Sequence, residues 1–247
     1  NYIKKLFSET FNETDSNIID SKISDCFSYT GSKNHPPDFL IKEGDAIEVK
    51  KIANVDQQLQ FNSSYPKNKL YSNDPMITQE CKNCEQWNEK DVLYIIGHVH
   101  NSIIHNLWFL YGDCFAAENE FYKQHINPIK QTLNENYPEL SPTKEIGRIN
   151  NFDPNGNTSL RIRGMYLVDN PNKVFKRLLV NNTTANFDMY CLIRENKYNS
   201  FNQNSINRIE FLNQDENNSL TIRDIRISDP NENDDSLIRA KLIHLYF

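Results

Sequence analysis

Apolar side chains recur at two different spacings along the chain. Over residues 1–30 they return at helical spacing, for example at Ile3, Phe7 and Ile23, which predicts helical structure. The stretch from Gly31 to Pro37 contains both Gly and Pro and ends that pattern. The first part of the chain is therefore expected to be helical up to this break.

Short apolar runs after the break predict strands. Residues 38–41 and 46–52 are separated by a turn that contains Gly44, which is a hairpin pattern. Residues 92–99 and 103–111 predict a second, buried hairpin. Further strands are expected at 160–168, 187–194, 206–212, 220–227 and 237–246.

The segments between these runs are polar or helical. Residues 53–91 predict a long surface segment with a short helix near 55–61, and Asp113 is placed to cap a helix that runs to about Tyr137 with an interruption at Pro128. No repeat or clear linker divides the chain, and 247 residues are compatible with a single domain. The predicted fold class is α/β or α+β, with a mixed β-sheet flanked by helices.

Composition narrows the possible functions. The net charge is −6 and the pI is about 5.6, which argues against a protein that coats nucleic acid nonspecifically. A specific DNA enzyme remains possible, because cations can gather on one face. Five scattered cysteines fit a reducing cytoplasm. No apolar run approaches the ~20 residues of a membrane span, and no signal peptide is visible, so a cytoplasmic protein without membrane contact is expected.

The first predicted hairpin carries the most informative side chains. Because side chains alternate along a strand, Ile47 and Val49 point to the core while Glu48 and Lys50 share the opposite face. The hairpin brings Asp38 beside them from the partner strand. The alternative interpretation is a surface hairpin with alternating charges, since Glu-x-Lys occurs by chance in many strands.

Two adjacent carboxylates favour a divalent cation, and hard oxygen ligands suit Mg²⁺. Asp38 and Glu48 are predicted metal ligands, with the backbone carbonyl of Val49 as a third. The ammonium of Lys50 is placed to orient an attacking water or to stabilise a phosphorane transition state. Asp38, Glu48 and Lys50 are therefore the candidate catalytic residues for phosphodiester hydrolysis.

This segment resembles the motif of the PD-(D/E)xK superfamily of type II restriction endonucleases. Three stretches are also similar to the NgoPII-like group: residues 36–51, residues 62–67, and residues 160–165 after Asp153 and Pro154. The resemblance covers roughly residues 30–175. It implies a nuclease-like core at about residues 15–135 and a β-rich part at about 145–247 for DNA recognition, within one domain spanning 1–247.

The resemblance further implies a bacterial, Mg²⁺-dependent homodimer that cuts double-stranded DNA at a short palindrome, with GGCC as the expected site. A cognate methyltransferase is expected in the same system, without a stable complex. Two competing functions remain open on the residues alone. One is a repair or junction nuclease with the same hairpin, and the other is a DNA-binding or interaction module in which the hairpin is structural.

Several polar residues outside the hairpin are candidate DNA contacts. Hydroxyl and ammonium groups commonly bind phosphate, whereas paired guanidinium groups on one strand face can read guanine. The alternatives are a solvated loop for the first group and a salt-bridged surface strand for the second. Lys144 and Arg148 are weaker candidates, and Gln57, Gln58 and Gln60 could contact DNA or cap a helix. The candidates are Ser63, Ser64, Tyr65, Lys67 and Lys69 in the loop, and Arg161 and Arg163 on the strand.

A zinc site is a further possibility. Cys81 and Cys84 have ligand spacing, and His98 and His100 on one strand face could complete a four-ligand set. A single Cys-x-x-Cys pair is weak evidence, and His-x-His on a buried strand is often structural. A zinc-stabilised interaction domain is accordingly the least favoured alternative.

Overall fold

The structure is a computed structural model that describes residues 2–31, 35–62, 64–179, 185–214, 219–232 and 236–247. Its helices are α1 (Tyr2–Phe7), α2 (Ser16–Cys26), α3 (Gln79–Asn83), α4 (Asn119–Asn136), α5 (Pro171–Val174), α6 (Glu195–Asn199) and α7 (Gln203–Gln214), with 3-10 turns η1 (Gly112–Cys114) and η2 (Lys176–Leu178). Its strands are β1 (Phe27–Thr30), β2 (Phe39–Ile41), β3 (Ala46–Ile52), β4 (Leu59–Asn62), β5 (Lys69–Tyr71), β6 (Glu89–His100), β7 (Ile103–Tyr111), β8 (Gly147–Ile149), β9 (Leu160–Ile162), β10 (Met165–Val168), β11 (Asp188–Arg194), β12 (Leu220–Ser228) and β13 (Leu237–Tyr246).

A mixed sheet forms the centre of the molecule. In the described part of the chain it has nine strands, in the order β1-β2-β3-β6-β7-β11-β13-β12, with β5 paired to the start of β6. The pairs β3–β6 and β7–β11 are parallel, whereas the other pairs are antiparallel. Two small ribbons, β4–β10 and β8–β9, lie outside this sheet. The predicted mixed α/β class is confirmed.

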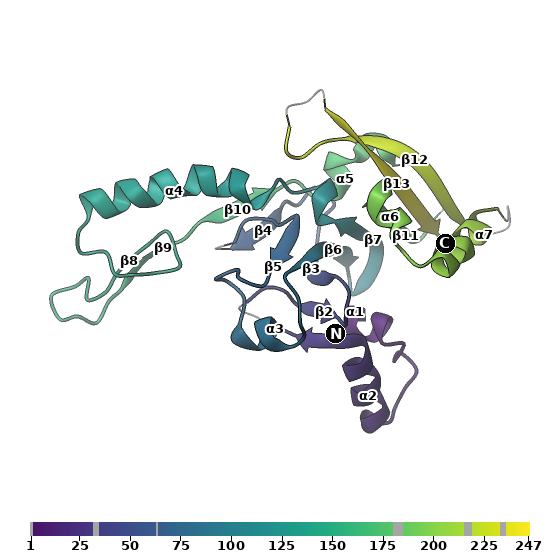
Figure 1. Cartoon of the computed structure of the whole chain (residues 1–247), viewed down its shortest axis with the longest axis horizontal. Coiled ribbons are helices and arrows are strands. Elements are labelled where there is room, and N and C mark those ends of the chain that lie inside the picture. The colour runs from purple at the N-terminus through teal and green to yellow at the C-terminus, as the bar shows by residue number, and fades with distance from the viewer. Residues whose placement is uncertain (1, 32–34, 63, 180–184, 215–218, 233–235) are drawn as a thin grey trace.

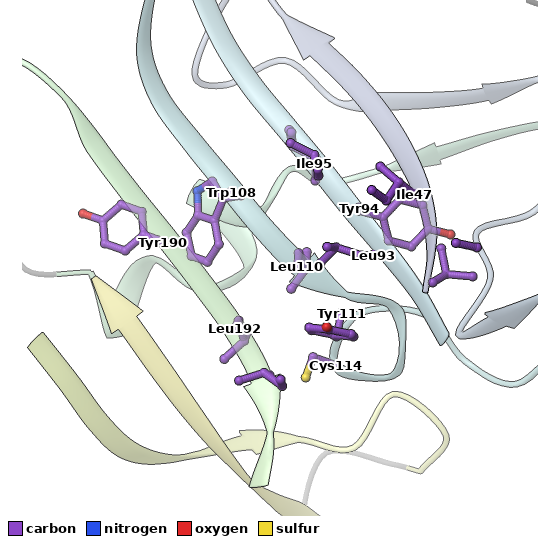
Figure 2. Packing of buried hydrophobic residues seen from close by; sticks show 14 of the residues in the cluster. Ile47, Leu93, Tyr94, Ile95, Trp108, Leu110, Tyr111, Cys114, Tyr190 and Leu192 are labelled. Carbon is purple, nitrogen blue, oxygen red and sulfur yellow. The ribbon is translucent and has the colours of Figure 1, made fainter. Parts of the chain in front are cut away.

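The core follows the middle strands of the sheet. Trp108 and Leu110 of β7 and Ile95 of β6 are almost completely buried. Figure 2 shows these side chains with Tyr190 of β11, whose ring stacks on Trp108 at 4.8 Å between centroids. Because β6 and β7 are covered on both sides, their sequences are continuous apolar runs. That property explains why the second predicted hairpin is confirmed.

One helix stands apart from this core. Figure 1 shows α4 and the β8–β9 ribbon extending together away from the sheet. No residue of α4 is fully buried, and Phe121, Ile129 and Tyr137 are about half exposed. The helix begins at Asn119 and continues through Pro128, so the expected cap at Asp113 and the expected interruption are wrong. Asp113 instead lies in η1 and forms an ion pair with Arg194 at 3.2 Å.

Several other local predictions are wrong. Helical structure was expected to continue to residue 30, but residues 27–30 form β1, paired with β2. The helix expected near 55–61 is replaced by β4, in which Leu59 and Phe61 are buried and their neighbours exposed, with the period of a strand. Residues 160–168 form two strands, β9 and β10, in separate ribbons.

The strand expected at 206–212 is the helix α7. Its apolar residues Ile206 and Ile209 are three positions apart, which places them on one helix face, and Ile206 is buried there. The local density of apolar residues is high enough for a strand, but their spacing is helical. Among the described residues, no helix is long and apolar enough to cross a membrane.

Candidate active site

The β2–β3 hairpin fixes Asp38 directly opposite the middle of β3. The Asp38 amide donates a hydrogen bond to the Ile47 carbonyl at 3.0 Å, and its carboxylate accepts one from the Val49 amide at 2.7 Å. On the other side, the Gly31 amide donates to the Asp38 carbonyl at 2.7 Å. A Cβ at residue 31 would collide with the Pro37 carbonyl oxygen, so only glycine permits this close approach.

Glu48 and Lys50 lie on one face of β3, as the strand alternation predicts. Their side chains are 18% and 23% exposed, and the Lys50 Nζ is 2.7 Å from a Glu48 carboxylate oxygen. The ammonium also lies 4.7 Å from the centre of the Phe61 ring, which belongs to β4. Because β3 is paired on both edges, with β2 and with β6, the backbone that carries this pair is rigid.

The electrostatics of the hairpin favour a cation. Burial raises the pKa of Glu48, and the neighbouring Asp38 carboxylate raises it further, while Lys50 acts in the opposite direction. A charged Glu48 is therefore costly without an added positive charge. The carboxylates of Asp38 and Glu48, together with the main-chain carbonyl of Val49, whose amide contacts Asp38, would give a hard oxygen donor set that suits a small divalent cation.

The protein supplies few ligands at this point. Among the described residues, no group of three or more His, Cys, Asp or Glu side chains could hold a metal. A cation between Asp38 and Glu48 would keep coordination positions for water and for a phosphate oxygen. Such an open site is what hydrolysis requires, since the metal must contact the substrate.

The hairpin opens into a cleft of about 420 Å³. This cleft, called here the hairpin cleft, also contains residues that the motif did not predict: His35, Gln60, Phe61, Asn62 and Tyr94. For Gln60 the sequence alone allows either a DNA contact or a helix cap. The alternation from Leu59 to Asn62 could have identified a strand here, but nothing local shows that it lies beside β3.

The predicted DNA-binding loop contains residues that line the cleft and lysines that form ion pairs within the protein. Ser64 and Tyr65 line the hairpin cleft and are partly exposed. Tyr65 stacks on Tyr122 with 4.7 Å between ring centres, and burial raises its pKa to about 12. Ser63 lies outside the described residues.

The two lysines of this loop are engaged within the protein. Lys67 is buried and forms an ion pair with Asp74 at 2.6 Å, in which both side chains are only 7% exposed. Lys69 pairs with Glu89 at 2.5 Å at a more exposed position. The Lys67 ammonium therefore has an internal partner, and breaking that pair would leave a buried charge uncompensated.

Arg161 and Arg163 lie on the exposed face of β9 and just beyond its end. Both are 48% exposed, and both contact the same carboxylate, Glu145, at 2.5 and 2.6 Å. These salt bridges match the alternative interpretation from the sequence. One carboxylate neutralises only one of the two guanidinium charges, so a net positive charge remains at this end of the ribbon. Arg148, the weaker candidate, donates a hydrogen bond to Asn150 at 2.8 Å.

A second cleft of about 410 Å³ adjoins the first and shares Ser64, Tyr65 and Lys67 with it. It lies between α4 and the loops around Asp74 and Glu145. Of the cations in its lining, Lys123 and Lys130 were not predicted from the sequence, whereas Lys67, Lys144 and Arg163 were. The cationic side chains of this cleft, called here the basic cleft, are Lys67, Lys123, Lys130, Lys144 and Arg163.

The residues of the possible zinc site are not gathered together. Cys81 is buried in α3, and Cys84 donates a weak hydrogen bond to the Cys81 carbonyl. His98 and His100 instead lie 5.7 and 6.5 Å from the ring of His105 on β7. Within the described ranges no four-ligand cluster exists, so the zinc alternative is wrong.

Comparisons with known proteins agree with the resemblance of the hairpin. A family model described as NgoPII restriction endonuclease matches residues 1–228. The chain is also 40% identical over 244 residues to the type II restriction enzyme NgoPII of Neisseria gonorrhoeae, covering 98% of this chain and 85% of that relative. No solved structure matches the chain. The chain therefore belongs to the NgoPII restriction endonuclease family and is a site-specific endonuclease of the type II restriction class.

Proposed function

We propose that this enzyme hydrolyses phosphodiester bonds of double-stranded DNA in a Mg²⁺-dependent reaction at the β2–β3 hairpin. The observation that carries the proposal is the placement of Asp38, Glu48 and Lys50 together in the hairpin cleft, with a Glu48 pKa raised by burial. Asp38, Glu48 and the Val49 carbonyl hold the cation. When bound, Mg²⁺ supplies positive charge for the phosphate and lowers the pKa of a water.

The protein's own groups then position the reactants. The Val49 amide holds one oxygen of Asp38, which orients the carboxylate toward the cleft. Lys50 is held between Glu48 and the face of the Phe61 ring. These two contacts fix the position of its ammonium beside the cleft. In that position it stabilises the negative charge that develops on the phosphate oxygens and orients the attacking water.

The substrate is proposed to be a short, GC-rich palindrome, with GGCC as the specific site. The support is the similarity to the NgoPII family across nearly the whole chain. A palindrome is matched by a two-fold protein, so the active species is proposed to be a homodimer. Within the region of about residues 145–247, the part around Arg161 and Arg163 is proposed to contribute to recognition, and a separate methyltransferase protects the host DNA.

A digest of plasmid DNA tests the proposal. Purified enzyme is incubated with Mg²⁺ or with EDTA, beside the variants Glu48→Gln and Glu43→Gln. The second variant is a matched control, because Glu43 has an exposed side chain in the turn of the same hairpin. Discrete bands are expected with wild type and Glu43→Gln in Mg²⁺ only, and none with Glu48→Gln.

The fragment ends then identify the site. Ends within GGCC, and protection of the DNA when that sequence is methylated, are expected. Discrete cutting at another sequence would reject GGCC and keep the endonuclease. Smears or single-strand nicks would favour a repair-type nuclease, and intact DNA under every condition would contradict the proposed chemistry. Sedimentation of the protein alone and with a site-containing duplex tests the homodimer.

A further inference from the structure

The β4–β10 ribbon has two chemically different faces. Its strands are antiparallel, with Phe61 opposite Tyr166 and Gln60 opposite Leu167. Because side chains alternate along each strand, the residues divide into two sets of four. One face carries Leu59, Phe61, Tyr166 and Val168, and the other carries Gln60, Asn62, Met165 and Leu167.

The inner face fastens the ribbon to the body of the enzyme. Leu59 and Phe61 are buried, and the Phe61 ring meets Tyr94 of β6 edge-on at 5.7 Å between centres. Tyr166 packs edge-on against Tyr65 at 6.0 Å. The connection beyond the ribbon is also held, because the Asn170 side-chain amide donates hydrogen bonds to the Val55 carbonyl at 2.6 Å and the Gln57 carbonyl at 2.8 Å.

The outer face has the opposite character. Met165 and Leu167 are 60% and 55% exposed, which is unusual for large apolar side chains on adjacent positions of one surface. Gln60 and Asn62 are exposed beside them and also line the hairpin cleft. Among the described residues, neither amide side chain forms a hydrogen bond or an ion pair. This face carries no charge.

We infer that the outer face of the β4–β10 ribbon reads base edges in the groove of the DNA whose phosphate occupies the hairpin cleft. This inference rests on the proposed function. A two-stranded ribbon fits the major groove, and an amide side chain offers both a donor and an acceptor to a base edge. The uncharged face and its apolar pair suit base edges, whereas phosphates are bound by cations.

The surroundings of the ribbon select DNA as the occupant. The hairpin cleft and the basic cleft share Ser64, Tyr65 and Lys67, and Tyr166 of the ribbon lines the basic cleft. Lys123, Lys130 and Lys144 provide positive charge in that cleft, whose lining does not include the catalytic carboxylates. A polyanion that passes both clefts would cross the ribbon, and its bases would face the amides. A protein partner would have no need for this charge arrangement.

The double variant Gln60→Ala/Asn62→Ala tests the inference. The measurement is the ratio of cleavage rates between the preferred site and duplexes with one base pair changed. Loss of the base contacts is expected to lower this ratio by about 10-fold or more, since a good base contact gives discrimination of this order. The matched control is Gln203→Ala/Asn207→Ala, an exposed amide pair on α7 whose side chains bond each other, and its ratio should equal that of wild type.

An unchanged ratio in the double variant would overturn the inference, as would equal loss of cleavage at every duplex. The second variant, Met165→Ser/Leu167→Ser, changes two exposed side chains and should therefore fold normally. It is expected to weaken binding to the site-containing duplex more than binding to a scrambled duplex. Binding measured in EDTA separates the two proposals. If wild type binds one sequence preferentially but cuts nothing in Mg²⁺, the catalytic proposal fails and the ribbon is still tested by the same variants.

Discussion

Two pairs of charged side chains at the same spacing have entirely different surroundings. Glu48 and Lys50 are two residues apart on β3, an inner strand of the large sheet, and are 18% and 23% exposed. Arg161 and Arg163 are also two residues apart, but at the β8–β9 ribbon, and each is 48% exposed. The first pair combines opposite charges, and the second pair holds like charges around one carboxylate.

The two pairs differ in how far their side chains are exposed to solvent. Where water is excluded, a charge interacts strongly with its neighbours and its pKa moves, as it does for Glu48. Where water has access, charges are screened and act mainly by attraction over a distance. The same sequence period thus yields a poorly hydrated charge pair, the proposed site of bond cleavage, in one place and a solvated pair, the proposed DNA contact, in the other.

The largest effect is expected from Lys50→Ala. Removing the ammonium from the buried pair should lower the cleavage rate by about 100-fold or more, the usual loss for one group that stabilises a developing anion. Lys51→Ala is the matched control, because Lys51 is exposed on the opposite face of the same strand. Single-turnover cleavage rates in Mg²⁺ measure both. A Lys50→Ala enzyme as fast as Lys51→Ala would remove Lys50 from the chemistry.

The second effect concerns the exposed pair. Arg161→Ala/Arg163→Ala should weaken binding to duplex DNA by on the order of 10-fold at moderate salt and lower the salt slope by up to about two units. The control Arg208→Ala/Arg226→Ala removes two exposed arginines from α7 and β12, far from the β8–β9 ribbon (Figure 1). Affinities are measured by fluorescence anisotropy over a range of salt. Equal losses in both variants would show only a general charge effect.

The third effect is on stability and depends on pH. Burial raises the pKa of Glu48, so the Glu48 carboxyl of the folded protein holds its proton more tightly than it does in the unfolded chain. The cost of the charged carboxylate appears as the pH rises above the ordinary Glu value of about 4.3. Glu48→Gln should therefore stabilise the metal-free protein at pH 7, and the gain should fade toward pH 4. Urea unfolding in EDTA measures it, and a loss of stability at pH 7 would contradict the expectation.

The smallest effect, of opposite sign, is expected from Glu145→Gln. Hydrogen bonding from Arg161, with help from Arg163, lowers the pKa of Glu145. That carboxylate stabilises the fold above its ordinary pKa, and the contribution is lost as the pH falls through the lowered pKa. The variant should be slightly less stable at pH 7 and equal to wild type in acid. It should also bind DNA more tightly, because two guanidinium groups are released; unchanged affinity would argue against their role.

The hairpin could be predicted from the sequence because everything that defines it is local. Asp38 and Lys50 are joined by a short turn, and the alternation of β3 places Glu48 and Lys50 on one face without knowledge of the rest of the chain. The apolar runs of β6 and β7 were equally clear. The expected strand at residues 206–212 was wrong because the high content of apolar residues was given more weight than their helical spacing.

The partners that distinguish the two charged pairs are distant in sequence and could not be predicted. Lys50 rests on Phe61 of β4, and β4 pairs with β10, about a hundred residues later. Glu145 lies between Arg161 and Arg163 only because β8 and β9 form a ribbon. Such contacts depend on pairing between strands that are distant in sequence, and the local spacing of apolar residues does not reveal which strands pair.

Phe61 connects the two proposed sites, the base-reading face of the β4–β10 ribbon and the catalytic hairpin. One side of its strand presents Gln60 and Asn62 outward, while its own ring supports the Lys50 ammonium. Any movement of β4 that accompanies a matched sequence displaces the surface on which that ammonium rests. Coupling of this kind is reciprocal in free energy: if a correct base sequence tightens the hold on the metal, the metal must tighten the hold on the correct sequence to the same degree. If both proposals hold, discrimination between sites is expected to be greater with Mg²⁺ present than without it.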